Sequence, residues 1–374
     1  MSLVTTDVPY SNGKFHMFLG PVHSGKVGML AGLLDGAGDS GYLERNRISF
    51  DDRFLIVRHP TDSENPRKLG KHDVHLVTEN PDEIANIVKD STRCVVIEGI
   101  AHFKNSGIVN LVDALVRSDR NVVSSALNLK ADGTLPNHLG GLLGIVDQLE
   151  LTRTYCQVRD CDSQEAARSM EHKNGHFYPV CVPHFAYLRN PPGGKRKLGK
   201  IEMYPGSVSS GKSSAAWRKA DERIEQKGQV LNFKPKDIVR YDETPAELFE
   251  IGTVRKHGGT HRDTVAVNIG MQIIEYIFTE GQVAPVEYRP KKWEKPTDVL
   301  IEEGQFFPDL IEACLKLSSM GINVIAPGLP RSFKRDAFGK YPDLMAFADR
   351  VDMSYATCVD CGHPATDNRR MIKG

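Results

Sequence analysis

The sequence has no net charge and no long apolar run, and each absence excludes a class of protein. Its 48 Lys and Arg residues balance 48 Asp and Glu residues, so nothing favours nucleic acid or an anionic membrane as a partner. No apolar run approaches the ~18 residues of a membrane-spanning helix. The first residues also lack an apolar signal segment, so we expect a soluble, cytoplasmic protein.

Cysteine is scarce as well. The chain has seven cysteines, which lie in two clusters or in predicted core segments. That distribution is not typical of a secreted framework held together by disulfides. In a reducing compartment, clustered cysteines are more often metal ligands.

The length of the chain allows two domains, each with an ordinary core. Adjacent prolines and glycines at residues 190–197 break both helix and strand, and the basic residues among them favour a solvated linker over a binding patch. We therefore predict one domain over residues 1–189, a linker over 190–199 and a second domain over 200–374.

The sequence does contain two phosphate loops of the Walker type. Residues 206–213 fit the pattern GxxxxGK[ST] fully, and residues 20–27 fit all of it except the last hydroxyl. The glycines let backbone N–H groups surround phosphate oxygens, the lysine balances phosphate charge, and the hydroxyl holds Mg²⁺. The predicted ATP and phosphate ligands are Gly206, Ser207, Val208, Ser209, Ser210, Gly211, Lys212 and Ser213, and Ser213 also binds Mg²⁺.

The two loops belong to a longer internal repeat. An apolar strand that ends in an acid follows each loop, at residues 95–98 and 299–302, and a second buried strand begins at Asn121 and at Asn323. Strand–loop–helix units of this kind predict a parallel sheet with helices on both faces. The predicted fold class is therefore α/β, with two tandem phosphate-loop domains that arose by duplication.

The segment 301–307, Ile-Glu-Glu-Gly-Gln-Phe-Phe, carries the predicted chemistry. Glu302 lies where a strand-end acid holds Mg²⁺ through water. Glu303, on the other side of the strand end, can accept a proton from an attacking hydroxyl, and Phe306 offers a flat surface to a base. The alternative interpretation is a charged strand end followed by two core phenylalanines. The full phosphate loop upstream favours the catalytic interpretation.

With these motifs the second domain resembles the type II thymidine kinases, deoxynucleoside kinases that have a RecA-like phosphate-loop core and a zinc lobe. The matching motifs are residues 205–213, 233–241, 257–258, 302–307, 328–329 and 358–362, with Phe333, Phe338, Ala365 and Arg370. The resemblance covers residues 200–374. It implies transfer of the γ-phosphate of ATP to the 5′-OH of thymidine or deoxyuridine, in deoxynucleotide salvage.

The resemblance also implies a role for each matching residue. Glu303 is the base for the 5′-OH, Glu302 serves the Mg²⁺ ion, and Arg370 lies near the phosphates. The implied nucleoside pocket consists of Phe306, Leu329, Phe333 and Phe338. Thymidine and ATP are the expected partners, and a homo-oligomer through kinase-type interfaces is expected because the family commonly forms dimers or tetramers.

The second domain departs from the family pattern at several positions. Pro330 stands where Asp is usual, Asn368 where a Thr lies near the thymine methyl group, and Glu302 where Asp is more common. The sequence ends at Gly374, before the loop that grips the base in the family and before a second pair of zinc ligands. Cys358 and Cys361 therefore have no evident partner ligands in the sequence.

These departures keep other functions open. A catalytically impaired nucleotide-binding pseudokinase, with a structural or regulatory role, would also explain a missing base loop. A RecA-like ATPase that acts on DNA would explain the phosphate loop, but not Glu303 beside Phe306. Turnover of ATP that depends on thymidine separates the kinase from the pseudokinase, and stimulation by DNA would indicate the ATPase.

The first domain is predicted to be a degenerate copy. Gly99 occupies the position of the base, Val27 cannot bind Mg²⁺, and His102 takes the stacking position. Lys26 and Glu98 remain, so weak nucleotide binding and a purely structural copy both stay open.

The zinc lobe of the first domain, in contrast, looks complete. Its predicted ligands are Cys156, Cys161, Cys181 and His184, in the spacing C-x4-C and C-x2-H. Four nitrogen and sulfur ligands in two pairs suit a closed tetrahedral Zn²⁺ site that contributes to folding and does no chemistry. Buried cysteines without a metal are the alternative. A small zinc-lobe-like segment is thus expected in each domain and complete only in the first.

Overall fold

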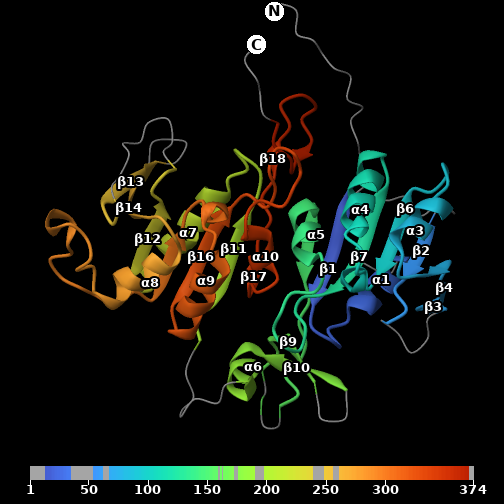
Figure 1. Ribbon diagram of the computed structural model, residues 1–374, viewed down its shortest axis with the longest axis horizontal. Helices are drawn as coiled ribbons and strands as arrows, with labels where there is room; N and C mark the ends of the chain where they lie inside the picture. The colour runs from blue at the N-terminus through green and yellow to red at the C-terminus, as the bar shows by residue number, and fades with distance from the viewer. Residues whose placement is uncertain are drawn as a thin grey trace, which may run out of the picture. The chain divides into compact units, whose positions relative to one another are not determined.

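The computed structural model divides into two compact units (Figure 1). The structure describes residues 13–34, 54–61, 67–158, 161, 163–171, 176–189, 198–238, 248–255 and 261–369. Of the residues and segments singled out in the sequence, residues 190–197 of the linker, residues 239–241 of the motif 233–241, residues 257–258, Arg370 and Gly374 lie outside this part of the chain. No helix within the described ranges is long and apolar enough to cross a membrane.

The first unit is built on a parallel sheet with strand order β5-β2-β6-β7-β1-β8. Its strands are β1 (Phe15–Gly20), β2 (Phe54–Arg58), β5 (Leu76–Val77), β6 (Cys94–Glu98), β7 (Asn121–Leu127) and β8 (Gln148–Leu151), with a small hairpin of β3 (Lys68–Leu69) and β4 (His72–Asp73). Its helices are α1 (Lys26–Leu34), α3 (Pro81–Ile87), η1 (Ile100–His102) and α4 (Gly107–Arg117). Every residue of β1 and β6 is buried, as the apolar runs in a parallel sheet require.

The second unit contains a larger sheet, ordered β13-β14-β12-β15-β16-β11-β17, in which only the edge strand β13 runs antiparallel. Its strands are β11 (Ile201–Pro205), β12 (Val230–Pro235), β13 (Ile251–Arg255), β14 (His261–Val267), β15 (Asp298–Ile301), β16 (Asn323–Gly328) and β17 (Arg350–Val351), and a short pair is formed by β18 (Ala356–Thr357) and β19 (Pro364–Ala365). Its helices after the linker are α7 (Lys212–Glu225), α8 (Met271–Phe278), η2 (Val286–Tyr288), η3 (Gly304–Phe306), α9 (Leu310–Ser319) and α10 (Tyr341–Met345).

The two sheets share both strand order and individual hydrogen bonds. The order β2-β6-β7-β1-β8 in one matches β12-β15-β16-β11-β17 in the other. Asn121 Oδ1 accepts from Lys14 N at 2.9 Å, and Asn323 Oδ1 accepts from Lys200 N at the same distance. The predicted α/β class, with two tandem phosphate-loop domains, is therefore confirmed. Origin by duplication stays a prediction.

The second unit also includes residues that precede the linker in the sequence. By its contacts it takes in residues 128–135, α5 (Leu139–Ile145) and residues 153–189, which carry β9 (Ala166–Glu171), β10 (Phe177–Cys181) and α6 (Val182–Arg189). Arg168 is buried and donates from Nη2 to the carbonyl oxygen of Phe347 at 2.8 Å. By its contacts the first unit is smaller than the predicted domain 1–189, since residues from Arg153 onward group with the second unit. The domain bounds stay a prediction.

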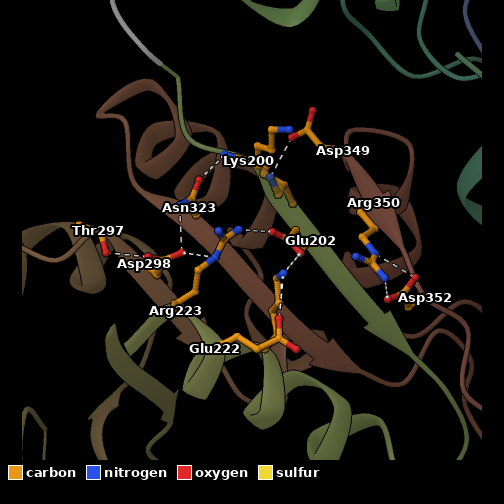
Figure 2. A network of polar contacts seen from close by, with 12 residues as sticks. Lys200, Glu202, Glu222, Arg223, Thr297, Asp298, Asn323, Asp349, Arg350 and Asp352 are labelled. Atoms are coloured by element: carbon orange, nitrogen blue, oxygen red, sulfur yellow. Dashed lines mark hydrogen bonds and ion pairs between the residues drawn. The ribbon is translucent and has the colours of Figure 1, made fainter. Parts of the chain in front are cut away.

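A polar network holds the N-terminal ends of the strands in the second sheet (Figure 2). The Arg223 guanidinium contacts Glu202 Oε1 at 2.6 Å and Asp298 Oδ1 at 3.2 Å, and Asn323 Nδ2 donates to the same Asp298 oxygen at 2.9 Å. These side chains fix β11, β15 and β16 relative to one another at one end. The opposite, carboxyl ends of the strands carry the loops, which is where open α/β sheets bind ligands.

Candidate active site

The phosphate loop of the second unit joins β11 to α7 in the conformation that its glycines permit. Gly211 and Ser209 both have left-handed backbones, with φ of 82° and 62°. Lys212 opens α7, and its Nζ donates to the carbonyl oxygen of Ser207 at 3.3 Å, across the loop. The loop therefore presents backbone N–H groups and one ammonium group at a helix N-terminus, which suits a phosphate.

The segment around β19 lies against this loop. Ser207 Oγ donates to the carbonyl oxygen of Ala365 at 3.0 Å, and the N–H of Val208 donates to Asn368 Oδ1 at 2.7 Å. Asn368 is thus a partner of the phosphate loop, a contact that the sequence did not indicate. Arg370 follows two residues later and lies outside the described residues, so its place near the phosphates stays a prediction.

The two acids after β15 have different partners. Glu302 is 1% exposed, and its Oε1 accepts a hydrogen bond from the indole nitrogen of Trp217 in α7. Glu303 caps η3 with a left-handed backbone, at a φ of 52°, and its Oε2 accepts from Gln305 Nε2 at 2.5 Å. A non-glycine residue in this conformation is strained, and such strain concentrates at functional sites.

Gln305 connects Glu303 to the next strand end, and sequence reasoning missed it. Its side chain is buried, and its Oε1 accepts from Leu329 N at 3.2 Å. A side-chain amide that donates to a carboxylate and accepts from a backbone N–H satisfies both of its ends. The signal that could have found it is its position, a polar residue between the acid pair and two phenylalanines.

The two phenylalanines of the motif have different environments. Phe307 is fully buried, whereas Phe306 is 41% exposed. The alternative of two core phenylalanines therefore holds only for Phe307. The Phe306 ring meets Phe338 edge to face, with centroids 5.2 Å apart and planes at 76°, and Phe333 is also exposed. Two of the four predicted pocket residues are thus in direct contact.

The loop that carries Phe338 is pinned at several points; we call residues 329–339 the pocket loop. Buried Arg331 pairs with Asp367 at 2.8 Å, and Arg335 contacts the same carboxylate. The N–H of Phe338 donates to the carbonyl oxygen of Pro330 at 3.1 Å, so the residue that departs from the family pattern closes the loop through its backbone.

The first unit keeps the shape of the phosphate loop. Gly25 and His23 have φ of 82° and 54°, matching Gly211 and Ser209. Lys26 Nζ donates to the carbonyl oxygen of Pro21 at 2.5 Å. The loop conformation is therefore retained although its last hydroxyl is absent.

The strand-end acid of the first unit, Glu98, has a different partner from its counterpart Glu302. Glu98 is buried and forms an ion pair with the equally buried Arg58 on the neighbouring strand β2. Gly99, in the position of Glu303, has a φ of 73° and no side chain. The first unit thus lacks a carboxylate at the place of the predicted base, and its remaining acid is already neutralised.

The predicted zinc ligands come together in the second unit. The ligand atoms of Cys156, Cys161, Cys181 and His184 all lie within 4.8 Å of one another. His184 Nδ1 is 3.4 Å from Cys156 Sγ and 3.2 Å from Cys181 Sγ. Burial raises the pKa of the Cys181 thiol, so a bound cation would be needed to keep it a thiolate at neutral pH.

The second cysteine pair forms a short turn instead. The N–H of Cys358 donates to the carbonyl oxygen of His363 at 2.8 Å, and Gly362 N donates back to Cys358 O at 2.9 Å. Within the described residues, no group of three or more candidate metal ligands includes Cys358 or Cys361.

Comparisons with known proteins match about half of the chain. The sequence model of a family described as "Thymidine kinase" matches residues 199–374. A thymidine kinase of Deinococcus deserti is 32% identical over 188 residues, which cover 50% of this chain and 85% of the relative. A thymidine kinase of Deinococcus radiodurans is 32% identical over 189 residues, which cover 50% of this chain and 81% of the relative.

Proposed function

The chain belongs to the thymidine kinase family, a family of phosphotransferases, and from that premise we propose that its second unit transfers the γ-phosphate of ATP to the 5′-OH of thymidine or deoxyuridine. The observation that carries the proposal is the position of Glu303. This carboxylate is held by Gln305 at the end of β15, in the same unit as a complete phosphate loop. Deoxynucleotide salvage in the cytoplasm is the process that such an activity serves.

The nucleoside base would bind at the aromatic pair. Phe306 is exposed and Phe338 meets it edge to face, so a planar pyrimidine can stack on one ring and touch the edge of the other. Leu329 and Phe333 belong to the same pocket loop and would complete the apolar wall. The N–H of Leu329 is already used by Gln305, which fixes this wall relative to the acid.

The proton of the 5′-OH would pass to Glu303. The hydrogen bond from Gln305 Nε2 orients the carboxylate. Phosphoryl transfer asks mainly for positioning and charge neutralisation, so the role of Glu303 is to hold the hydroxyl and take its proton as the new bond forms.

The phosphates would lie in the loop 206–213, where Lys212 would balance their charge. Arg370, from the segment after β19, would provide a second positive charge. The Ser213 hydroxyl and the Glu302 carboxylate are hard oxygen donors of the kind that Mg²⁺ prefers. Because Glu302 is buried and receives the Trp217 indole N–H, we assign it to the ion through water. Mg²⁺, when bound, neutralises charge on the transferred phosphoryl group.

The Cys/His cluster is proposed as a structural Zn²⁺ site. Its atoms fit four-coordinate zinc in number, type and mutual distance. All four ligands come from the protein, so the site would contribute to folding and not to catalysis.

The alternative, a pseudokinase with a structural or regulatory role, is favoured by observations on the first unit alone. Gly99 provides no base, and Arg58 neutralises Glu98. We propose that the first unit is the inactive copy of a duplicated kinase, and that the chain forms homo-oligomers through kinase-type interfaces.

The deciding experiment measures ADP release by the full chain with thymidine, with deoxycytidine, with single-stranded DNA and with no acceptor. Thymidine-dependent ADP release, with thymidine monophosphate as the product, is expected. ADP release that responds only to DNA would support an ATPase, and no thymidine-dependent turnover at all would reject the kinase assignment.

A further inference from the structure

Helix α5 is rich in glycine although it is buried. Its sequence, Leu-Gly-Gly-Leu-Leu-Gly-Ile, has glycine at positions 140, 141 and 144, and all its residues except Gly141 are buried. Glycine is a poor helix former, so its repeated use in a seven-residue helix indicates that another backbone approaches closely. In chain order α5 follows β7 of the first unit, but its contacts are with α10 of the second.

The close approach at Gly144 is to backbone. A Cβ atom on Gly144 would lie 2.9 Å from Ala337 Cα and 3.3 Å from Ala337 N. Contacts that short must be relieved by movement of the main chain, because neither atom is on a flexible side chain. At Gly140 the added Cβ would instead overlap Asp343 Oδ1, the end of a side chain that can rotate away.

Ala337 belongs to the pocket loop and directly precedes Phe338. It forms a bridge with Arg331, whose guanidinium is tied to Asp367. On the other side of Phe338, Gly339 approaches the carbonyl oxygen of Gln305 so closely that a Cβ would overlap it. The pocket loop is therefore held on both sides of Phe338, by the Arg331 bridge and by the Gln305 carbonyl. Although Ala337 itself is exposed, a shift of its main chain is passed on to Phe338.

We propose that Gly144 is a positioning residue for the nucleoside pocket of the second unit. Resting on the proposed function, the inference is that α5 sets the position of Ala337, and through it the distance between Phe338 and Phe306. The edge-to-face contact of those rings, with centroids 5.2 Å apart, sets the surface on which a pyrimidine would stack. A segment encoded before the linker thus tunes nucleoside binding in the catalytic half, without touching the substrate.

The test compares three glycine-to-alanine changes in the full-length protein. Gly144→Ala is expected to raise the KM for thymidine about fivefold or more and to leave the KM for ATP within about twofold. Gly140→Ala is the control in the same helix, and Gly32→Ala in α1, where an added Cβ meets nothing within 4 Å, is the control for an ordinary helical glycine. Both controls should keep the wild-type KM for thymidine.

Two further measurements separate positioning from general damage. Thymidine binding by calorimetry without ATP should weaken in Gly144→Ala by the same factor as the KM rises. Ala337→Gly removes the Ala337 Cβ, which an added Cβ on Gly144 would approach to 3.0 Å. Combined with Gly144→Ala, it should partly restore thymidine binding. If Gly144→Ala does not fold, Ala337→Gly alone should raise the thymidine KM by loosening the loop, and a wild-type KM there would overturn the inference.

The outcomes also separate this inference from the proposed function. An active wild-type enzyme whose thymidine KM is the same in Gly144→Ala and Gly140→Ala would reject the positioning role and leave the kinase assignment intact. A wild-type protein that binds no thymidine would reject the kinase assignment and the inference together. A Gly144→Ala variant in which the KM for thymidine and the KM for ATP rise by the same factor while the melting temperature falls would show a purely structural role.

Discussion

Glu303 and Gly99 occupy the same backbone position in the two units, and both are left-handed. Each residue caps a short 3-10 helix at the end of the strand that carries the first acid, with φ of 52° for Glu303 and 73° for Gly99. A left-handed backbone costs a non-glycine residue about 1–2 kcal/mol. The second unit bears this cost and has a carboxylate there, whereas the first unit has neither the cost nor the carboxylate.

Glu303→Gln should therefore reduce thymidine phosphorylation by about 10²–10⁴-fold, the usual contribution of a general base. The amide can still accept the hydrogen bond from Gln305, so ATP binding and the melting temperature should stay close to wild type. Steady-state kinetics with a fluorescent ATP-binding assay measures both. The matched control is Gly99→Ala, which should destabilise the first unit by about 1 kcal/mol and leave turnover unchanged. A Glu303→Gln enzyme with more than a tenth of wild-type turnover would contradict the assignment of the base.

The lysines of the two phosphate loops should differ in importance. Lys212→Ala is expected to abolish most turnover because the loop 206–213 loses the charge that balances the phosphates. Lys26→Ala should change turnover little, because Glu98 is paired with Arg58 and Val27 offers no hydroxyl. Titration with an ATP analogue, with and without Mg²⁺, compares binding in both variants. Equal kinetic damage from the two substitutions would show that the roles of the units are wrongly assigned.

The Arg58–Glu98 pair should stabilise the first unit without affecting catalysis. Both side chains are at most 2% exposed, and removing one partner of such a pair leaves a buried charge at a cost of about 3–5 kcal/mol. Arg58→Met should accordingly lower the urea midpoint of the first unit and leave the thymidine KM unchanged. The double variant Arg58→Met with Glu98→Gln should recover most of the loss. A loss of kinase activity in the folded single variant would mean that the first unit takes part in turnover.

Metal analysis should find about one zinc per chain, a prediction that follows from the single four-ligand cluster within the described residues. Cys181→Ser combined with His184→Ala should release it, and chelation should lower the melting temperature. Zinc that survives this double substitution would reject the site. Two tightly bound zinc ions per chain would show that Cys358 and Cys361 find further ligands.

The sequence predicted those parts of the site that depend on neighbouring residues. Glycine and lysine spacing was enough to locate the phosphate loops, and the apolar runs before Glu98 and Glu302 were enough to locate β6 and β15. The pattern could not separate Phe306 from Phe307, because both are large and apolar and only the fold exposes one of them.

The features that were missed depend on contacts between segments far apart in the chain. Gln305 accepts a hydrogen bond from Leu329, and Asn368 accepts one from Val208. The approach of Gly144 to Ala337 joins segments on opposite sides of the linker. Local composition carries no sign of such pairs, which is also why the grouping of residues 153–189 with the second unit by contacts was not expected from the sequence.

That packing leads to the last prediction, which concerns residues 200–374 expressed alone. In the full chain, the carbonyl oxygens of Phe347 and Ala346 accept hydrogen bonds from Arg168 Nη2 at 2.8 Å and Asn128 Nδ2 at 3.4 Å. Burial lowers the pKa of Arg168 to about 10, which is still above neutral pH, so the guanidinium remains charged there. A fragment without residues 128–189 would leave these carbonyls and the buried face of α10 exposed.

We therefore expect the fragment 200–374 to be less soluble than the full chain and to melt at a lower temperature. A fragment that begins at residue 128 keeps α5 and the Cys/His lobe, and it should recover most of the lost stability. Arg168→Met in the full chain is the point test of the same contact; it should lower the melting temperature, since a charge-assisted hydrogen bond contributes about 1.5–3 kcal/mol. Light scattering and thermal melts of the four proteins decide the matter. A fragment 200–374 that is monomeric, as stable as the full chain and as active would show that the earlier segments are dispensable for the catalytic fold.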